Sequence, residues 1–375
     1  MVATATNDNA KKTAKSAKRA ATGAKTAPAE VRKVLIRRGG SYDKLEQVSE
    51  PPKAPAAGQV AIDVRAIGVN YADVMVRMGL YSSAKEFIGW PITPGFEVSG
   101  VVSAIGDGVD DLAVGDEVIA VTLFGGYTSH LVVDAQYVFP KPKGVSFEAA
   151  AGVPAVMLTA WYAVHELAHP RPGAAVLVHS AAGGVGGSLV QILKRAGCKV
   201  VGVVGGSHKV ETARALGADV VIDKSKVGKG LWREAERHAP DGYDVIFDAN
   251  GVATLKDSYA HVRKAGKLVV YGFHTMIPKE GGRPNWVKLA ADFLRTPRFS
   301  PLEMTQSSKS VLAFNLSYLF DRTELFRPAV AELTGWLEDG TLQAPPTTVY
   351  PLADVARAHR DIESGKTVGK LILVP

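Results

Sequence analysis

The chain of 375 residues is 46% hydrophobic and 22% charged, a composition typical of a globular protein long enough for two domains. Its single cysteine, Cys198, excludes a disulfide framework and a zinc cluster of several thiolates, so we expect a reduced, cytoplasmic setting. Apolar runs stay below the ~20 residues that a spanning helix needs, and we therefore expect no transmembrane segment.

Residues 1–30 form a basic segment rich in Ala, Lys and Thr. It carries six Lys/Arg and two acids, which gives +4 of the net charge of +7. Because it has no apolar periodicity, we predict a disordered, solvated tail. Non-specific contact with nucleic acid and a targeting presequence remain open as alternatives, and we favour neither.

Short alternating segments separated by Gly, Pro and Asp follow from Val31 to Leu158. Examples are "VRKVLIRR", "QVAIDVRAIGVN", "FEVSGVVSAIG" and "GDEVIAVTLFGGYTSHLVV". Such spacing is typical of a β-rich domain of coiled or barrel-like form. We therefore assign residues 31–158 to a first domain of this kind.

The pattern changes after residue 159, where apolar strands alternate with amphipathic helices. Strands are predicted at 175–179, 199–204, 219–223, 243–250 and 267–273, and helices at 187–197, 207–218, 230–239 and 253–266. This alternation predicts an α/β fold with a doubly wound parallel sheet over residues 159–318. Gly217 and Gly266 are expected as left-handed helix caps.

The last part of the chain contains one more apolar strand candidate, "SVLAFNLSYLF" at 310–320, and then a helix and a strand that end at Pro375. We expect residues 319–375 to return to the first domain. An exposed edge strand as apolar as 310–320 would aggregate, so we predict that it pairs with its copy in a homodimer.

A glycine-rich turn lies between the strand at 175–179 and the helix that follows it. The spacing Ala181-x-Gly183-x-x-Gly186 in a strand–turn–helix setting is typical of dinucleotide binding. Gly183 allows a pyrophosphate to approach the backbone, and Gly186 allows the helix to pack closely on its strand. The predicted cofactor contacts of this turn are Ala182, Gly183, Gly184, Val185 and Gly186.

The end of the second strand of this domain favours NADPH over NADH. An NAD site usually has an acid there, roughly 20 residues beyond the turn, but the sequence reads "VVGGSHK". Ser207 and Lys209 occupy this place and Lys224 follows the third strand, and these groups suit a 2′-phosphate. For Lys209, an ordinary solvated lysine at a helix start remains the alternative.

The motifs "GVNYADVMVRMGLY", "PITPGFEVSGVVSAIG", "FGGYTSHLVV" and "VLVHSAAGGVG" together resemble the zinc-independent quinone oxidoreductases of the medium-chain dehydrogenase/reductase superfamily. The stretches "SVLAFNLSYLF" and "TVGKLILVP" more narrowly resemble the branch of the synaptic vesicle membrane protein homologues. The resemblance implies a GroES-like catalytic domain, a Rossmann domain inserted in it, NADPH as cofactor and a homodimer.

The resemblance also implies site residues. Asn70 and Tyr81 match positions that line the nicotinamide pocket, and Thr159, Gly272 and Asn315 match positions near the cofactor. Lys224 departs from the family, where many members have a tyrosine, and residues 274–308 are longer than in the simplest members. Purely structural roles remain open for Asn70, in a turn, and for Tyr81, as a packed aromatic ring.

The sequence predicts no metal. Zinc-dependent relatives have a cysteine near the position of Asn70 and a histidine where this chain has Phe96. The stretch "HELAH" at 165–169 fits a zinc-protease pattern, but Pro170 and Pro172 end its helix at once, so we interpret the match as chance.

Without a metal to stabilise an alkoxide, a conjugated acceptor suits the site better than a simple ketone. We expect hydride transfer to a quinone, enone or enoyl thioester, with Tyr81 or Asn70 stabilising the charge that develops on oxygen. The alternative is a non-catalytic protein associated with lipid or nucleic acid, motivated by the basic tail and the basic segment 279–298.

Overall fold

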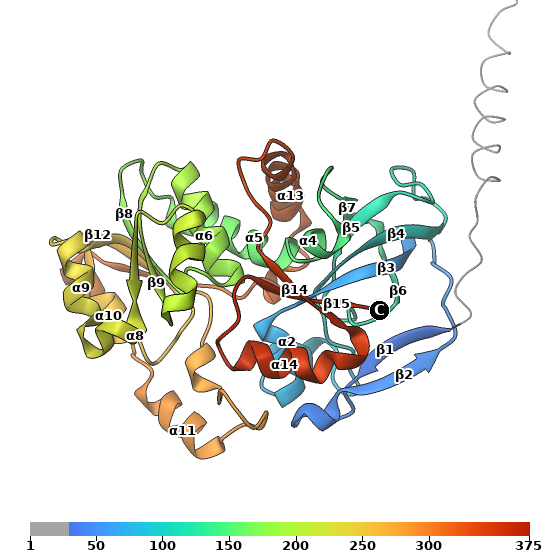
Figure 1. Cartoon of the computed structure of the whole chain (residues 1–375), viewed down its shortest axis with the longest axis horizontal. Coiled ribbons are helices and arrows are strands. Elements are labelled where there is room, and N and C mark those ends of the chain that lie inside the picture. Colours follow the sequence, from blue (N-terminus) through green and yellow to red (C-terminus); the bar gives the residue numbers. More distant parts are fainter. Residues whose placement is uncertain (1–29) are drawn as a thin grey trace, which may run out of the picture.

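The computed structural model describes residues 30–375, which form two lobes lying side by side (Figure 1). The predicted disordered tail lies outside the described residues, apart from Glu30. In this described part of the chain, no helix has both the length and the apolar character needed to cross a membrane.

The first lobe is built on a seven-stranded sheet in the order β14-β15-β3-β4-β5-β7, with β6 paired to β3. Its strands are antiparallel except for the parallel pair β14 and β15. This arrangement confirms the β-rich, GroES-like domain. The strands are β3 (Gln59–Val69), β4 (Glu97–Ile105), β5 (Glu117–Val121), β6 (His130–Asp134), β7 (Val138–Pro140), β14 (Thr347–Pro351) and β15 (Lys370–Val374).

Shorter elements complete the first lobe. A two-stranded sheet and four helices pack against the main sheet, with clusters of apolar side chains buried between them. These elements are β1 (Val31–Leu35), β2 (Glu46–Glu50), α2 (Tyr71–Met78), α3 (Ser82–Phe87), α4 (Phe147–Ala151) and α14 (Val355–Glu363).

The second lobe contains a six-stranded sheet in the order β10-β9-β8-β11-β12-β13, and every neighbouring pair is parallel. The predicted doubly wound parallel sheet is therefore confirmed. Its strands are β8 (Ala175–His179), β9 (Lys199–Val204), β10 (Val220–Asp223), β11 (Tyr243–Asp248), β12 (Val262–Val270) and β13 (Ser310–Ala313). The connecting helices are α6 (Gly184–Arg195), α7 (Val210–Ala215), α8 (Lys224–Val227), α9 (Leu231–His238) and α10 (Leu255–Ala260).

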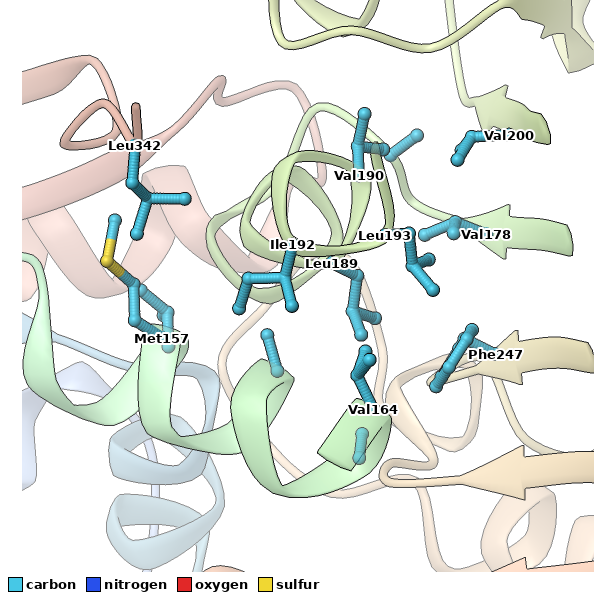
Figure 2. Close-up of a cluster of buried hydrophobic side chains, with 14 of the residues drawn as sticks. Met157, Val164, Val178, Leu189, Val190, Ile192, Leu193, Val200, Phe247 and Leu342 are labelled. Atoms are coloured by element: carbon cyan, nitrogen blue, oxygen red, sulfur yellow. The ribbon is translucent and has the colours of Figure 1, made fainter. Parts of the chain in front are cut away.

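Helix α6 is the centre of the core of this lobe. Its side chains contact the strands on one side and, on the other, α5 (Pro154–Trp161) and its continuation Tyr162–Ala168 (Figure 2). Each fully buried aliphatic side chain here stabilises the fold by about 1.5–3 kcal/mol. The core thus fixes the start of α6, and with it the glycine turn, against the sheet. The contributing side chains include Met157, Val164, Val178, Leu189, Ile192, Leu193 and Phe247.

Two expectations about the second lobe are corrected. The helix expected over 253–266 ends at Ala260, because Val262 already pairs with Tyr243 in the sheet. Gly266 is therefore no helix cap, and the left-handed residue there is Ala265 with a φ of 62°. Gly217, with a φ of 104°, does take the expected left-handed conformation after α7.

The apolar stretch 310–320 is also shorter as a strand than expected. Only Ser310–Ala313 pairs with the sheet, and Leu316–Leu319 forms a 3₁₀ turn. The turn begins at Asn315 because its side-chain oxygen accepts a hydrogen bond from the Ser317 amide at 3.1 Å.

Three helices lie between or beside the lobes. Helix α13 (Thr323–Glu338) packs against α5, and the chain returns to the sheet of the first lobe at β14. Helices α11 (Trp286–Arg295) and α12 (Pro301–Ser307) lie in the long segment after β12, and α11 projects from the body of the molecule (Figure 1).

Candidate active site

A large cavity of about 1080 Å³ is lined by residues of both lobes. It brings together almost all the residues that the sequence singled out, although they come from distant parts of the chain. Ser207 is the exception, because it does not line the cavity. The predicted residues that line it are Asn70, Tyr81, Thr159, Ala182, Gly183, Gly184, Val185, Gly186, Lys209, Lys224, Gly272 and Asn315.

The glycine turn is tightly packed at Gly186 and more open at Gly183. A Cβ at Gly186 would overlap the carbonyl oxygen of Ser180, so only glycine allows α6 to pack this closely on the turn. A Cβ at Gly183 would meet only that same oxygen, at 3.3 Å. The room around Gly183 and the amide groups of the first turn of α6, which have no acceptor within the helix, suit a bound anion.

A strand from the other lobe closes on this turn. The amide of Gly369 donates to the carbonyl of Ala182 at 3.0 Å, immediately before β15 begins. Gly369 has a φ of 65°, and a Cβ there would overlap the carbonyl oxygen of Pro346. The two lobes are thus joined by a main-chain hydrogen bond at the point where the sequence predicts the cofactor.

Cationic side chains gather beyond the end of β9. Lys209, Lys224 and Lys279 all line the cavity, and the Lys209 ammonium donates to the carbonyl of Gly365 at 2.6 Å. Burial, and then the charge of Lys279, lowers the pKa of Lys209. Among residues 30–375, Glu363 is the one acidic residue that lines the cavity. A ligand bound here meets positive charge at this end.

Ser207 contacts an acid instead of the cavity. Its hydroxyl donates to Asp223 at 2.5 Å, and this bond leads the causes that lower the pKa of Asp223. The other oxygen of Asp223 accepts from the amide and the hydroxyl of Ser225. The hydroxyl hydrogen of Ser207 is therefore engaged by Asp223, and Ser207 does not line the cavity. Its position does not support the predicted contact with a cofactor phosphate.

Asn70 lies at the end of β3 and starts α2 with a capping box in which Asp73 accepts from the Asn70 amide at 2.8 Å. Its side-chain Nδ2 donates to Glu97 Oε1 at 2.9 Å, and its Oδ1 accepts from Lys370 at 2.5 Å. Lys370 also pairs with Glu97 at 2.6 Å, and Glu97 is held by the amide of Ala155 at 2.7 Å. Sequence reasoning missed Lys370; the available signal was a lysine opening the apolar strand "KLILV".

The loop that carries Asn70 is fixed by a fully buried carboxyl. Asp73 also accepts from the amide of Gly95 at 2.9 Å and from the hydroxyl of Tyr127 at 3.0 Å. Burial raises the pKa of Asp73 to about 7, and the hydrogen bonds that it accepts oppose this rise. These contacts agree with a structural role for Asp73.

Tyr81 and Asn315, both predicted from the sequence, contact each other across the cavity. The Tyr81 hydroxyl donates to Asn315 Oδ1 at 3.0 Å, and the ring packs edge-on against Phe96 and Phe124. Burial raises the pKa of Tyr81, so its hydroxyl stays protonated at neutral pH. The single hydroxyl hydrogen of Tyr81 is thus already engaged.

Further residues of the cavity lining follow the end of β12, and one, Thr159, lies on α5. Burial lowers the pKa of His274 to about 4, so this ring is neutral at physiological pH. The hydroxyl of Tyr271 is buried without a hydrogen-bond partner among the described residues, and Tyr271 lines the cavity. Thr159 donates to the carbonyl of Ala155 at 2.6 Å. A Cβ at Gly272 would lie only 3.1 Å from the carbonyl oxygen of Ala249, and glycine avoids this close contact.

Much of the cavity lining is apolar and aromatic, with rings from both lobes. Such a wall excludes water and accommodates a flat or extended apolar molecule. Phe96 packs against Tyr81, and the other aromatic residues of this part of the cavity lining are Tyr137, Phe139, Phe314, Phe320 and Phe326.

The "HELAH" stretch has surroundings that differ from those of a metal site. His165 packs between the rings of Trp161 and Trp336, with centroid distances of 5.2 and 6.2 Å. His169 has a φ of 45° and ends the helix. Residues 30–375 contain no group of three or more His, Cys, Asp or Glu placed to hold a metal ion.

Comparisons with known families agree with the two lobes. Residues 56–143 match the alcohol dehydrogenase GroES-like domain, and residues 216–373 match a zinc-binding dehydrogenase family. The synaptic vesicle membrane protein VAT-1 homolog of Rattus norvegicus is 32% identical over 338 residues, which cover 90% of this chain and 82% of that protein.

Two solved structures show a similar fold. The Escherichia coli quinone oxidoreductase, crystallised in complex with NADPH, is 26% identical with a TM-score of 0.80 and covers 92% of this chain and 100% of its own. The CurK enoyl reductase is 29% identical with a TM-score of 0.79 and covers 92% of this chain and 99% of its own.

Proposed function

Since the chain belongs to the medium-chain dehydrogenase/reductase superfamily, in the family of the VAT-1 homologues, we propose that it is an NADPH-dependent oxidoreductase that reduces a conjugated acceptor. The acceptor is a quinone, an enone or an enoyl thioester. The observation that carries this proposal is one continuous cavity that joins the glycine turn, Asn70, Tyr81 and an aromatic wall. The related quinone oxidoreductase and enoyl reductase structures support the same reaction class.

The residues present fit NADPH. The pyrophosphate would lie on the glycine turn, where Gly183 leaves open room and the first turn of α6 offers free amide groups. Lys209 and Lys224 would face the 2′-phosphate, and the carboxylate that an NAD ribose requires is missing at this end of the cavity among the described residues. The orphan hydroxyl of Tyr271 is a further donor that a ligand would satisfy.

When bound, NADPH supplies a hydride, and the acceptor oxygen gains negative charge as the hydride arrives. Asn70 keeps one Nδ2 hydrogen that has no acceptor among residues 30–375, so we propose that this N–H stabilises the developing charge. The Tyr81 hydroxyl would serve the acceptor only after leaving Asn315. With Asn70 and Phe96 at the positions of the cysteine and histidine of zinc-dependent relatives, we propose a reaction without zinc.

The test is NADPH oxidation by the purified full chain with a panel of quinones, enones and enoyl thioesters. We expect turnover of at least one acceptor class, an at least tenfold lower kcat in Asn70→Ala, and full activity after dialysis against a chelator. Activity lost to the chelator and restored by zinc would contradict the zinc-free reaction. A protein that binds NADPH and reduces none of the panel would contradict the proposed activity.

The alternative of a lipid-associated protein is favoured by one observation. Helix α11 exposes Trp286, Val287, Phe293 and Leu294, which are between 67% and 82% exposed, and the surrounding segment 279–298 is basic. Such a helix suits an anionic lipid surface. Co-sedimentation with phosphatidylserine vesicles, compared with phosphatidylcholine vesicles, tests it. The double variant Trp286→Ser/Phe293→Ser, which removes two exposed apolar side chains of α11, should abolish this binding.

We also propose a homodimer. Strand β13 is the edge of the six-stranded sheet and pairs only with β12 among the described residues, so its outer main-chain groups are available to a second copy. Pairing across a two-fold axis would extend the sheet into the partner.

A further inference from the structure

Lys370 is a buried lysine that the proposed reaction does not yet use. It is 3% exposed, lines the cavity and contacts two side chains, Glu97 Oε1 at 2.6 Å and Asn70 Oδ1 at 2.5 Å. Glu97 is fully buried and is anchored from its other oxygen by the amide of Ala155. A lysine, a glutamate and an asparagine from three strand ends thus form a closed cluster beside the reaction cavity.

The cluster determines which way the Asn70 amide faces. A lysine ammonium only donates hydrogen bonds and a carboxylate only accepts them. Lys370 therefore requires the carbonyl oxygen of Asn70 on its side, and Glu97 requires the amide nitrogen on the other. Since one Nδ2 hydrogen is used by Glu97, the second is the group left for a ligand in the cavity.

The surrounding backbone is shaped to admit this cluster. A Cβ at Gly68 would overlap Glu97 Oε1, and a Cβ at Gly152 would lie 3.0 Å from Lys370 Cγ. A buried ion pair of this kind is weak evidence for stability, because apolar residues of similar volume are often equally stabilising. Its position against Asn70 points to a role in orienting that side chain.

We propose that Lys370, through its paired contacts with Glu97 and Asn70, is a positioning residue that holds an Asn70 N–H donor toward the acceptor oxygen. This inference rests on the proposed reduction of a conjugated acceptor. Lys370 fixes the carbonyl of Asn70, Glu97 fixes one hydrogen, and the remaining donor is presented without reorganisation when charge develops. Without the pair, the amide can turn its oxygen to the cavity and repel that charge.

The kinetic test uses a double substitution that leaves no unpaired charge. In Lys370→Met/Glu97→Gln we expect kcat to fall at least tenfold, while the Kd for NADPH, from fluorescence titration, changes less than twofold. The same pair introduced into Asn70→Ala should cause no further loss, since a residue that acts through Asn70 has nothing left to orient. The single variant Lys370→Arg, which keeps a cationic donor at this position, should retain most of the wild-type activity.

Three kinetic results would overturn the proposal. Wild-type kcat in the double variant would show that Asn70 needs no orienting pair. An equal additional loss in the Asn70→Ala background would show that Lys370 acts independently of Asn70. A large loss of NADPH affinity with kcat retained would assign Lys370 to cofactor binding instead.

A measurement on the wild-type protein separates this inference from the proposed activity. Selective ¹⁵N-asparagine labelling and NMR, with Asn70→Ala for assignment, should show that the Asn70 side-chain proton bound to Glu97 is protected from solvent exchange. Asn70 side-chain protons that both exchange as fast as those of exposed asparagines would overturn the positioning role, whether or not the enzyme is active. Protected protons in a protein that reduces no acceptor would contradict only the proposed activity.

Discussion

Replacing Gly183 by alanine separates the cofactor role of the glycine turn from its role in folding. The backbone of Gly183 has a φ of −86°, which alanine adopts freely, and the new Cβ would meet only the Ser180 carbonyl oxygen, at 3.3 Å. Alanine is a poorer N-cap than glycine by less than about 1 kcal/mol, and reduced freedom of the unfolded chain offsets about 0.4–1 kcal/mol of that cost. We therefore expect the free energy of unfolding to change by less than about 1 kcal/mol.

The effect on NADPH is expected to be much larger. The added methyl group occupies the room through which a pyrophosphate would approach the first turn of α6. Losing one or more charged hydrogen bonds costs about 1.5–3 kcal/mol each, which corresponds to a roughly tenfold to hundredfold higher Kd. Fluorescence titration with NADPH and thermal unfolding of the same samples measure the two effects separately.

Two other glycines serve as controls. Gly186→Ala forces a Cβ onto the Ser180 carbonyl, so it should lower the melting temperature as well as NADPH affinity. Gly335→Ala, inside α13 with nothing within 4 Å of the new Cβ, should raise stability by up to about 1 kcal/mol and leave the Kd unchanged. Normal NADPH affinity in a folded Gly183→Ala protein would refute the placement of the pyrophosphate on this turn.

Four further outcomes are expected. Lys209→Ala should weaken NADPH binding roughly tenfold or more and leave NADH binding unchanged, since one charged contact with the 2′-phosphate is lost; equal losses in titrations with both cofactors would contradict the assignment. Tyr81→Phe removes the hydroxyl that would donate to the acceptor oxygen as charge develops, and one neutral hydrogen bond of about 0.5–1.5 kcal/mol corresponds to a two- to tenfold lower kcat in steady-state kinetics with unchanged NADPH affinity; unchanged kcat would remove Tyr81 from the mechanism. The pKa of His274 is lowered from 6.5 in the unfolded chain to about 4 in the folded protein, so protonation of the unfolded chain removes up to about 3 kcal/mol of stability as the pH falls from 6.5 to 4. Denaturant unfolding of His274→Gln should therefore show a smaller loss of stability over that range. Identical pH profiles of the two proteins would contradict the lowered pKa of His274. Light scattering at micromolar concentration should give the mass of a dimer, and a monomer would refute the pairing of β13.

Local patterns in the sequence were enough to predict the two kinds of lobe. The strands of a parallel sheet are buried on both faces, so each strand is apolar throughout, and each covering helix has one apolar face. Both patterns can be recognised within a single segment of the sequence. The glycine turn was equally visible, because Gly186 is required by a backbone contact only six residues away, with Ser180. Both features depend on short stretches of chain, so spacing alone identifies them.

Other local expectations failed where tertiary contacts outweighed local preference. The helix expected to continue to Gly266 gives way to β12 because Val262 finds a partner in β11. The apolar stretch 310–320 leaves the sheet at Ala313, and Asn315, which starts the turn that follows, accepts a hydrogen bond from Tyr81, 234 residues away. Burial and hydrogen bonding against distant residues decide such boundaries.

The chemistry of the cavity was decided by contacts between residues far apart in the chain. Asn70 and Lys370 are 300 positions apart and Tyr81 and Asn315 are 234 apart, and no spacing rule relates them. The sequence identified Asn70, Tyr81 and Asn315 by their resemblance to a family. Only the folded chain shows that Lys370 contacts the first of them, that the other two bind each other and that Ser207 donates to Asp223. A hydrogen bond depends on the position of two atoms in space and leaves no local pattern in either segment.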